Sequence, residues 1–153
     1  MSKVAFETTL LVRDTCLCLQ MQRAARALAR RFDEVLRPLE LTNGQFSLMM
    51  ALNQPQPPSI GRVASVLAMD RTTLTAALKP LERRGLVEVA VDPTDRHSRL
   101  MILTRAGRTL LSKAVPIWER THVAVEELLR DHDPDRLRRA LAALSSEGSQ
   151  ARK

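Results

Sequence analysis

The chain has 153 residues, of which 44% are hydrophobic, which suits a folded domain with a sizeable core and excludes a disordered chain. No apolar run approaches the ~20 residues of a membrane helix, and two cysteines are too few for a disulfide framework, so we expect a cytoplasmic protein with no membrane partner. The formal net charge of +7 favours a polyanionic partner, and because 3% aromatic content without tyrosine disfavours single-strand stacking, duplex DNA is the favoured one.

The N-terminal part of the chain predicts one long helix over residues 15–39, which Pro38 helps to end. Apolar residues recur along it at intervals of three and four, namely Leu17, Met21, Ala24, Leu28, Phe32, Val35 and Leu39. A stripe of this length with few local partners indicates a contact between helices or subunits. Residues 1–40 are therefore assigned to dimerisation.

A second helix is predicted to begin after Thr42. Thr42 and Gln45 have the spacing of a capping box, in which each side chain bonds a free backbone N–H of the first turn. The stretch "NQPQPPS" (53–59) contains three prolines and must be a loop.

Two short helices are expected next, over residues 59–68 and 70–84. Asp70 is a good N-cap for the second one, and Gly85 is the expected stop behind it. The inner face of this second helix is apolar and consists of Leu74, Leu78 and Leu81.

The pattern then changes from helix to strand. "LVEVAV" (86–91) and "RLMILT" (99–104) have the composition of strands, and "DPTDRHS" between them predicts a turn with a charged tip. Two helices followed by such a hairpin form a winged helix-turn-helix, which we assign to residues 41–104. Thr104 is placed to cap the helix that follows.

The C-terminal part predicts two further helices. The first is bent at Pro116, and the second begins after Asp133 and carries an apolar face of Leu137, Leu141 and Leu144. Residues 105–147 are assigned to dimerisation and residues 148–153 to a disordered tail. The expected fold class is mainly α with a small β-hairpin wing: a winged helix-turn-helix flanked by N- and C-terminal dimerisation helices.

The outer residues of the second short helix and of the hairpin tip are the candidate DNA contacts. The major groove admits such a helix, and arginine, lysine and threonine side chains contact base edges and phosphates. Each of these residues alone is an ordinary surface residue, and it is the order of the elements that favours DNA binding. The candidates are Arg71, Thr72, Thr73, Thr75 and Lys79 on the helix, and Arg96, His97 and Arg99 on the hairpin.

Two segments resemble the MarR family of transcriptional regulators. They are "SIGRVASVLAMDRTTLTAALKPLERRGLVEV" and "DPTDRHSRLMILTRAGR", the latter similar to the family's wing pattern "DxxDRR…LxLTxxG". The resemblance covers roughly residues 15–145. It implies a triangular homodimer on a pseudo-palindromic operator, most often a repressor that a small phenolic ligand or an oxidant releases.

The resemblance also implies roles for individual residues. Arg96 would enter the minor groove from the wing tip, and Asp92 or Asp95 would hold the wing through a salt bridge. Thr72, Thr73 and Thr75 would lie in the major groove. The sequence departs from the family pattern at Ala76, where the family often has arginine, and at His97, where it has the second arginine of "DRR".

The two cysteines, Cys16 and Cys18, are candidates for oxidant sensing. On one continuous helix they lie ~200° apart, so they would neither pair with each other nor share a metal ion. Cys18 lies beside the apolar stripe, which favours simple packing. Its spacing to Arg26 resembles the first-helix segment of the peroxide-sensing OhrR-type branch, but the tyrosines of that branch are absent here.

Other classes of function have less support in the sequence. A thiol-dependent redox protein or peroxidase using Cys16 or Cys18 is the main alternative, although no histidine stands at a catalytic spacing from them. A helical module that binds protein or RNA is a third class. We expect no enzyme activity and no cofactor, and no Cys/His set has the spacing of a metal site.

Overall fold

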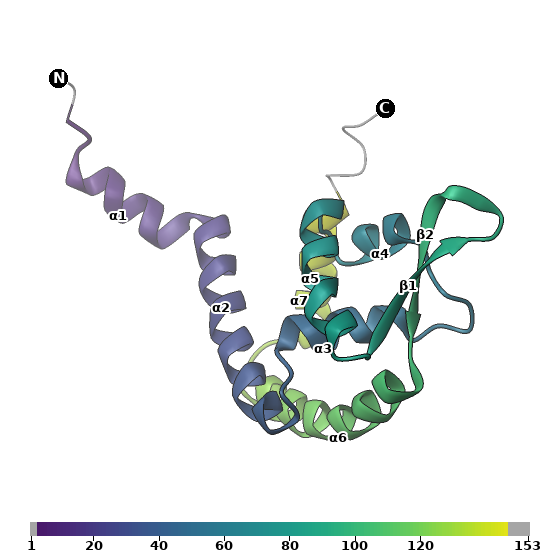
Figure 1. The fold of residues 1–153 in the computed structure, drawn as a ribbon. Helices are drawn as coiled ribbons and strands as arrows, with labels where there is room; N and C mark the ends of the chain where they lie inside the picture. Colours follow the sequence, from purple (N-terminus) through teal and green to yellow (C-terminus); the bar gives the residue numbers. More distant parts are fainter. Residues whose placement is uncertain (1–2, 147–153) are drawn as a thin grey trace.

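The computed structural model describes residues 3–146, which form a helical body with a two-stranded hairpin on one side (Figure 1). The elements in chain order are α1 (Phe6–Thr15), α2 (Leu17–Leu36), the 3₁₀ helix η1 (Arg37–Leu39), α3 (Asn43–Leu52), α4 (Ile60–Val66), α5 (Arg71–Arg83), β1 (Val87–Asp92), β2 (Asp95–Leu103), α6 (Arg105–Glu127) and α7 (Pro134–Ser146). The predicted fold class, mainly α with a β-hairpin wing, is confirmed. The tail expected at 148–153 lies outside the described residues.

One hydrophobic core holds the body together, and its buried residues run from Leu36 at the end of α2 to Ala114 in α6. Helix α5 contributes the three leucines predicted for its inner face, each at most 1% exposed: Leu74, Leu78 and Leu81. Because burying a leucine contributes about 1.5–3 kcal/mol, this face fixes α5 firmly on α4 and the hairpin.

Local capping sets where the helices of the body begin. Thr42 and Gln45 form the predicted capping box, and the Ser59 hydroxyl accepts a bond from the Arg62 N–H at 3.2 Å. The Thr104 hydroxyl accepts from the Gly107 N–H at 3.0 Å and donates to the Gly85 carbonyl at 2.7 Å. The bonds that cap the three helix starts join residues three positions apart and can therefore be predicted from the sequence, whereas the bond from Thr104 to Gly85 cannot.

Gly107 shows why the "LxLTxxG" pattern ends in glycine. A Cβ atom at this position would lie 2.2 Å from the Leu86 carbonyl oxygen and 2.8 Å from a methyl carbon of Leu103. Glycine therefore lets the start of α6 lie directly against the base of the hairpin.

The predicted single helix over 15–39 is wrong at both ends. Cys16 has extended backbone (φ −70°, ψ 108°) and separates α1 from α2, so the chain bends there (Figure 1). At the other end, Pro38 lies within η1, and Glu40 then turns the chain with φ 53°. The helix α1 was not predicted, because its few apolar residues do not recur at a regular helical spacing.

The helices outside the body leave large apolar side chains exposed. Neither α1 nor α7 contains a buried residue. The exposed apolar residues of these two helices are Phe6, Leu11, Val12, Leu137, Leu141 and Leu144, each at least 42% exposed. Among residues 3–146, no helix has both the length and the apolar content to cross a membrane.

Candidate nucleic-acid interface

The outer face of α5 is a shallow hollow between two cations. Asp70 caps this helix, and the turn before it passes through Ala68 at φ 51°, so α4 and α5 meet closely. With its leucines buried, α5 presents the opposite side to solvent. There a hollow of about 370 Å³ is lined by Arg71, Thr72, Thr75, Ala76 and Lys79.

The structure separates the three threonines that the sequence grouped together. Thr72 and Thr75 line the hollow, but the Thr73 hydroxyl donates to the Asp70 carboxylate at 2.7 Å, as does the Thr73 N–H. These bonds, first the one from the backbone, lower the pKa of Asp70. Thr73 is therefore a capping residue that lies outside the hollow.

Arg71 lies over the backbone of the neighbouring helix α4. A Cβ atom on Gly61 would be only 2.8 Å from an outer nitrogen of the Arg71 guanidinium. Because Gly61 has no side chain, this guanidinium can pack against α4 at one end of the hollow, a position that we call its seat. This contact joins two helices, so no short sequence pattern indicates it.

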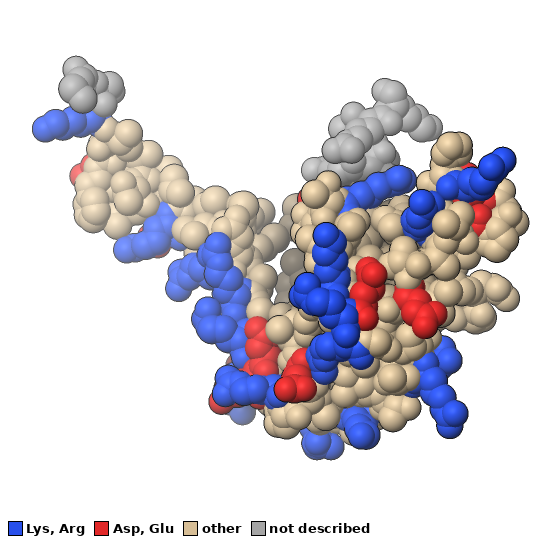
Figure 2. Space-filling model, viewed as in Figure 1, with Lys and Arg blue, Asp and Glu red and all other residues tan. Residues whose placement is uncertain are grey.

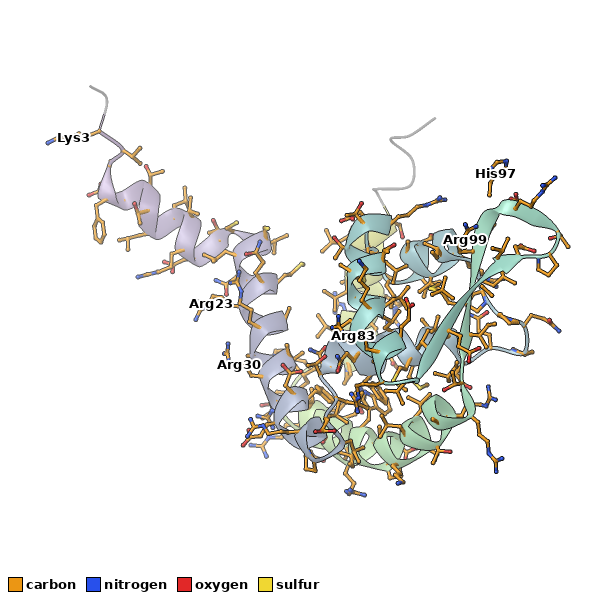
Figure 3. All side chains as sticks on the ribbon, in the orientation of Figure 1. Lys3, Arg23, Arg30, Arg83, His97 and Arg99 are labelled. Carbon is orange, nitrogen blue, oxygen red and sulfur yellow. The ribbon has the colours of Figure 1, made fainter. Side chains whose placement is uncertain are left out.

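The tip of the hairpin is a bulge rather than a simple turn. Val91 pairs with Arg99 and Asp92 pairs with Asp95, so residues 96–98 have no pairing partner on β1. Figure 3 shows His97 at the outer end of the hairpin and Arg99 nearer the body. The bulge thus contains Arg96 and His97, neither of which pairs with β1.

Arg99 supports this bulge from below. Its Nη1 atom donates to the carbonyl oxygens of Arg96 at 3.1 Å and Ser98 at 3.2 Å. The guanidinium is thus engaged with the backbone that carries Arg96. The sequence predicts that Arg99 contacts DNA. In the structure its guanidinium instead holds the backbone of its neighbours.

The expected wing salt bridge is not formed by either aspartate among residues 3–146. Asp92 instead accepts bonds from the Thr94 N–H and hydroxyl, both at 2.8 Å, and Asp95 accepts from the His97 N–H at 2.9 Å. The bonds from Thr94, led by its N–H, lower the pKa of Asp92. Both carboxylates hold the turn through backbone bonds, which the motif comparison did not anticipate.

Figure 2 shows two groups of basic side chains on the side of the molecule that faces the viewer. One group follows α2 and includes Arg23 and Arg30, and the other lies at the lower end of α5, where Figure 3 labels Arg83. Arg83 was not predicted as a site residue, although it stands four positions after Lys79 and so lies on the same face of α5.

The cysteines lie at the bend between α1 and α2. Cys16 is half-buried at the junction itself, whereas Cys18 is exposed, and its sulfur accepts a bond from the Gln22 amide at 3.2 Å. Gln22 in turn accepts one from Arg26 at 3.3 Å. Because Cys16 is not helical, the helical-angle argument against pairing does not apply to it. Within the described residues no group of side chains is arranged to hold a metal ion.

Comparison with known proteins places this arrangement in a family. The MarR family profile matches residues 41–98. The transcriptional regulator MosR of M. tuberculosis, solved in complex with DNA, superimposes with a TM-score of 0.80 at 35% identity, over 90% of this chain and 99% of MosR. The chain belongs to the MarR family.

Other family members are similar over parts of the chain. The regulator TtmR of Methylorubrum extorquens is 35% identical over 100 residues, which span 65% of this chain and 51% of TtmR. The organic hydroperoxide resistance regulator of Bacillus subtilis is 29% identical over 101 residues, or 66% of this chain and 69% of that protein. The chain thus spans about half the length of TtmR and two thirds of the Bacillus regulator.

Proposed function

We propose that this MarR-family protein is a dimeric, sequence-specific DNA-binding regulator that represses transcription. The observation that carries the proposal is the outer face of α5, where a hollow between Arg71 and Lys79 lies on a helix whose other face is locked into the core. A helix of this kind fits the major groove. The similar proteins MosR and CouR were each solved bound to DNA, CouR with a TM-score of 0.77 at 28% identity over 94% of this chain and 99% of CouR.

The wing supplies the second part of the proposed interface. Arg96 would enter the minor groove beside the major groove that α5 occupies, with His97 near the backbone. The bulge at residues 96–98 supports this role, because it leaves both side chains exposed and unpaired with β1. Arg99, Asp92 and Asp95 would act by holding that bulge in shape.

A second copy of the chain would complete the interface. One winged domain makes too few contacts to be specific, and two domains about 34 Å apart reach successive turns of a pseudo-palindromic operator. The exposed apolar residues of α1 and α7 support a homodimer, since soluble monomers rarely expose such surfaces.

For release from DNA we propose one of two signals, an oxidant acting on the cysteines or a small phenolic ligand. The contact from Gln22 to the exposed sulfur of Cys18 and the similarity to the Bacillus hydroperoxide regulator favour the oxidant. Peroxide treatment of the wild type, Cys16→Ser and Cys18→Ser separates the two. Oxidant-induced release that either variant abolishes supports the first signal, and unchanged DNA binding by oxidised wild type contradicts it.

A competition shift assay tests the function itself. Labelled duplex DNA from the region upstream of the protein's own gene is mixed with the protein and challenged with unlabelled duplex DNA or duplex RNA of the same sequence. We expect the DNA to compete and the RNA not to compete. Equal competition would indicate a general RNA or polyanion binder, and steady peroxide consumption by reduced protein without DNA binding would indicate the thiol enzyme.

A further inference from the structure

We propose that the hollow on α5 is a pocket for the methyl group of thymine, and that Ala76 makes the protein select an A·T pair at the base position it faces. This inference rests on the proposed DNA-binding function and deepens it. The evidence comes from which atoms line the hollow, how its hydroxyl groups are used, and where its cations lie.

The hollow exists because the side chain of Ala76 is shorter than those of the other lining residues. The lining residues stand at positions i, i+1, i+4, i+5 and i+8 of α5, which all fall on one side of a helix. Ala76 ends at its Cβ atom, and longer side chains surround it. An arginine at this position, which is frequent in the family, would fill the space, so the depression follows from this chain's own residue.

The hydroxyl of Thr75 is bonded within its own helix. It donates to the Arg71 carbonyl oxygen at 2.8 Å, four residues earlier in the same helix. Because the Thr75 hydroxyl proton is used in this bond, the side chain offers its methyl group as the free contact. Thr75 and Ala76 are both exposed and together present an apolar surface at the centre of the helix face.

The two cations stand at the ends of the hollow rather than across it. The Arg71 guanidinium lies against Gly61 of α4, and Lys79 follows two helical turns later. This leaves an apolar centre between two groups that attract phosphates. The arrangement matches an edge of duplex DNA, which presents base atoms in the groove between two charged backbones.

Thymine is the base that fits such a centre. In the major groove it displays a C5-methyl group, which alanine and threonine methyl groups contact, whereas guanine displays two acceptors that call for a forked donor such as arginine. Burying one methyl group contributes about 0.8 kcal/mol of binding free energy, which corresponds to a roughly fourfold gain in affinity. With one such contact in each half-site, the dimer would gain about 15-fold.

Deoxyuridine tests the inference because it lacks only the methyl group of thymine. Duplexes that bind the full-length protein are first selected from a random-sequence library. The tightest duplex is then synthesised with each symmetric pair of thymines replaced in turn by deoxyuridine. We expect one pair of positions at which the replacement weakens binding by about 15-fold and little change elsewhere.

Matched variants show whether the α5 hollow is responsible. Thr75→Ser and Ala76→Gly each remove a methyl group from the hollow and should reduce the effect of deoxyuridine at that position. Thr73→Ser is the control: it removes a methyl group outside the hollow, keeps the hydroxyl that bonds Asp70, and should leave the effect unchanged.

The outcomes separate the two proposals. Failure to bind any duplex would overturn the proposed function and this inference with it. Specific binding that tolerates deoxyuridine at every position would overturn the methyl pocket alone. A deoxyuridine effect that persists in both Thr75→Ser and Ala76→Gly would place the methyl contact elsewhere and would also overturn it.

Discussion

The body of the molecule buries its apolar side chains, whereas its two outer helices, α1 and α7, leave theirs exposed. Between Leu36 and Ala114 the chain buries its own core, with residues such as Met49 and Met101 completely inaccessible. Helices α1 and α7 bury no residue at all, and Figure 1 shows α1 extending away from the body. One part of the chain folds against itself, and the other leaves its apolar side chains exposed, as the proposed homodimer requires.

This difference separates the role of the body, which is to hold a fixed fold, from the role proposed for the outer helices, which is assembly. A self-sufficient core can hold α5 and the wing in a fixed geometry, whether or not a second copy is bound. In the proposed dimer, the outer helices would set the spacing of two such units without disturbing the surface proposed to read DNA. Changes in the two regions should therefore have different consequences, one for folding and one for assembly.

Leu141→Asp should have the largest effect, and it should fall on assembly. Burying an unpaired carboxylate costs several kcal/mol, and a symmetric interface pays this cost in both copies. We expect the dimer dissociation constant to rise at least roughly 100-fold while the helical content stays the same. Analytical ultracentrifugation together with circular dichroism measures both.

Ala142→Asp is the control for this change, since it adds the same charge on the side of α7 away from Leu137 and Leu144. It should assemble like the wild type. If Leu141→Asp also sediments as the wild type does, α7 does not form the subunit contact.

Gly107→Ala should damage the body instead. The new methyl group would collide with the Leu86 carbonyl, and overpacking of this kind typically costs about 1–3 kcal/mol. We expect the melting temperature to fall by roughly 3–10 °C in differential scanning calorimetry. Gly44→Ala is the matched control, because its nearest neighbour would be 3.9 Å away, and equal losses in the two variants would refute the close packing at Gly107.

Gly61→Ala should leave both folding and assembly intact and alter only the proposed DNA surface. The added methyl group displaces the Arg71 guanidinium from its seat on α4, which we expect to weaken DNA binding by roughly two- to tenfold. Fluorescence anisotropy with labelled duplex measures the change. In an Arg71→Ala background the same substitution should have no further effect, and an undiminished loss there would show that Gly61 acts by another route.

The smallest expected effect is a loss of stability of the hairpin wing at acidic pH, when Asp92 becomes protonated. Bonds from Thr94 lower the pKa of Asp92, so the ionised carboxylate stabilises the folded wing. That stabilisation is complete above the ordinary aspartate pKa of about 3.9 and is lost as the pH falls through the lower folded value. An NMR titration of the Asp92 carboxyl carbon should have its midpoint below that of the same residue in the denatured chain. A midpoint at or above the denatured value would contradict these bonds.

Much of the body could be predicted from the sequence, because its signals are local. The caps at Thr42, Ser59 and Asp70 each involve residues three positions apart, and the buried leucines of α5 repeat with the helical period. The order of two helices and a hairpin then indicated the winged fold. The same order gave most of the residues that line the α5 hollow.

The remaining features depend on contacts that no short pattern records. The seat of Arg71 requires Gly61 from another helix, and the support of the bulge by Arg99 requires the register of the two strands. Cys16 interrupts a stretch that has no proline or glycine at the bend, so the break between α1 and α2 left no strong sequence signal. Thr73 looked like its neighbours until its bonds to Asp70 were seen.

The salt dependence of DNA binding by wild type, Arg96→Ala and Arg120→Ala tests the proposed interface most directly. Affinity for a duplex from upstream of the protein's own gene is measured by anisotropy over a range of salt concentrations. Removal of the Arg96 charge, which would lie between the phosphates that flank the minor groove, should lower the slope of log affinity against log salt by about one, whereas loss of the exposed Arg120 on α6 should leave it unchanged. Equal slopes for all three proteins, or no binding to duplex DNA, would contradict the proposed interface of α5 and the wing.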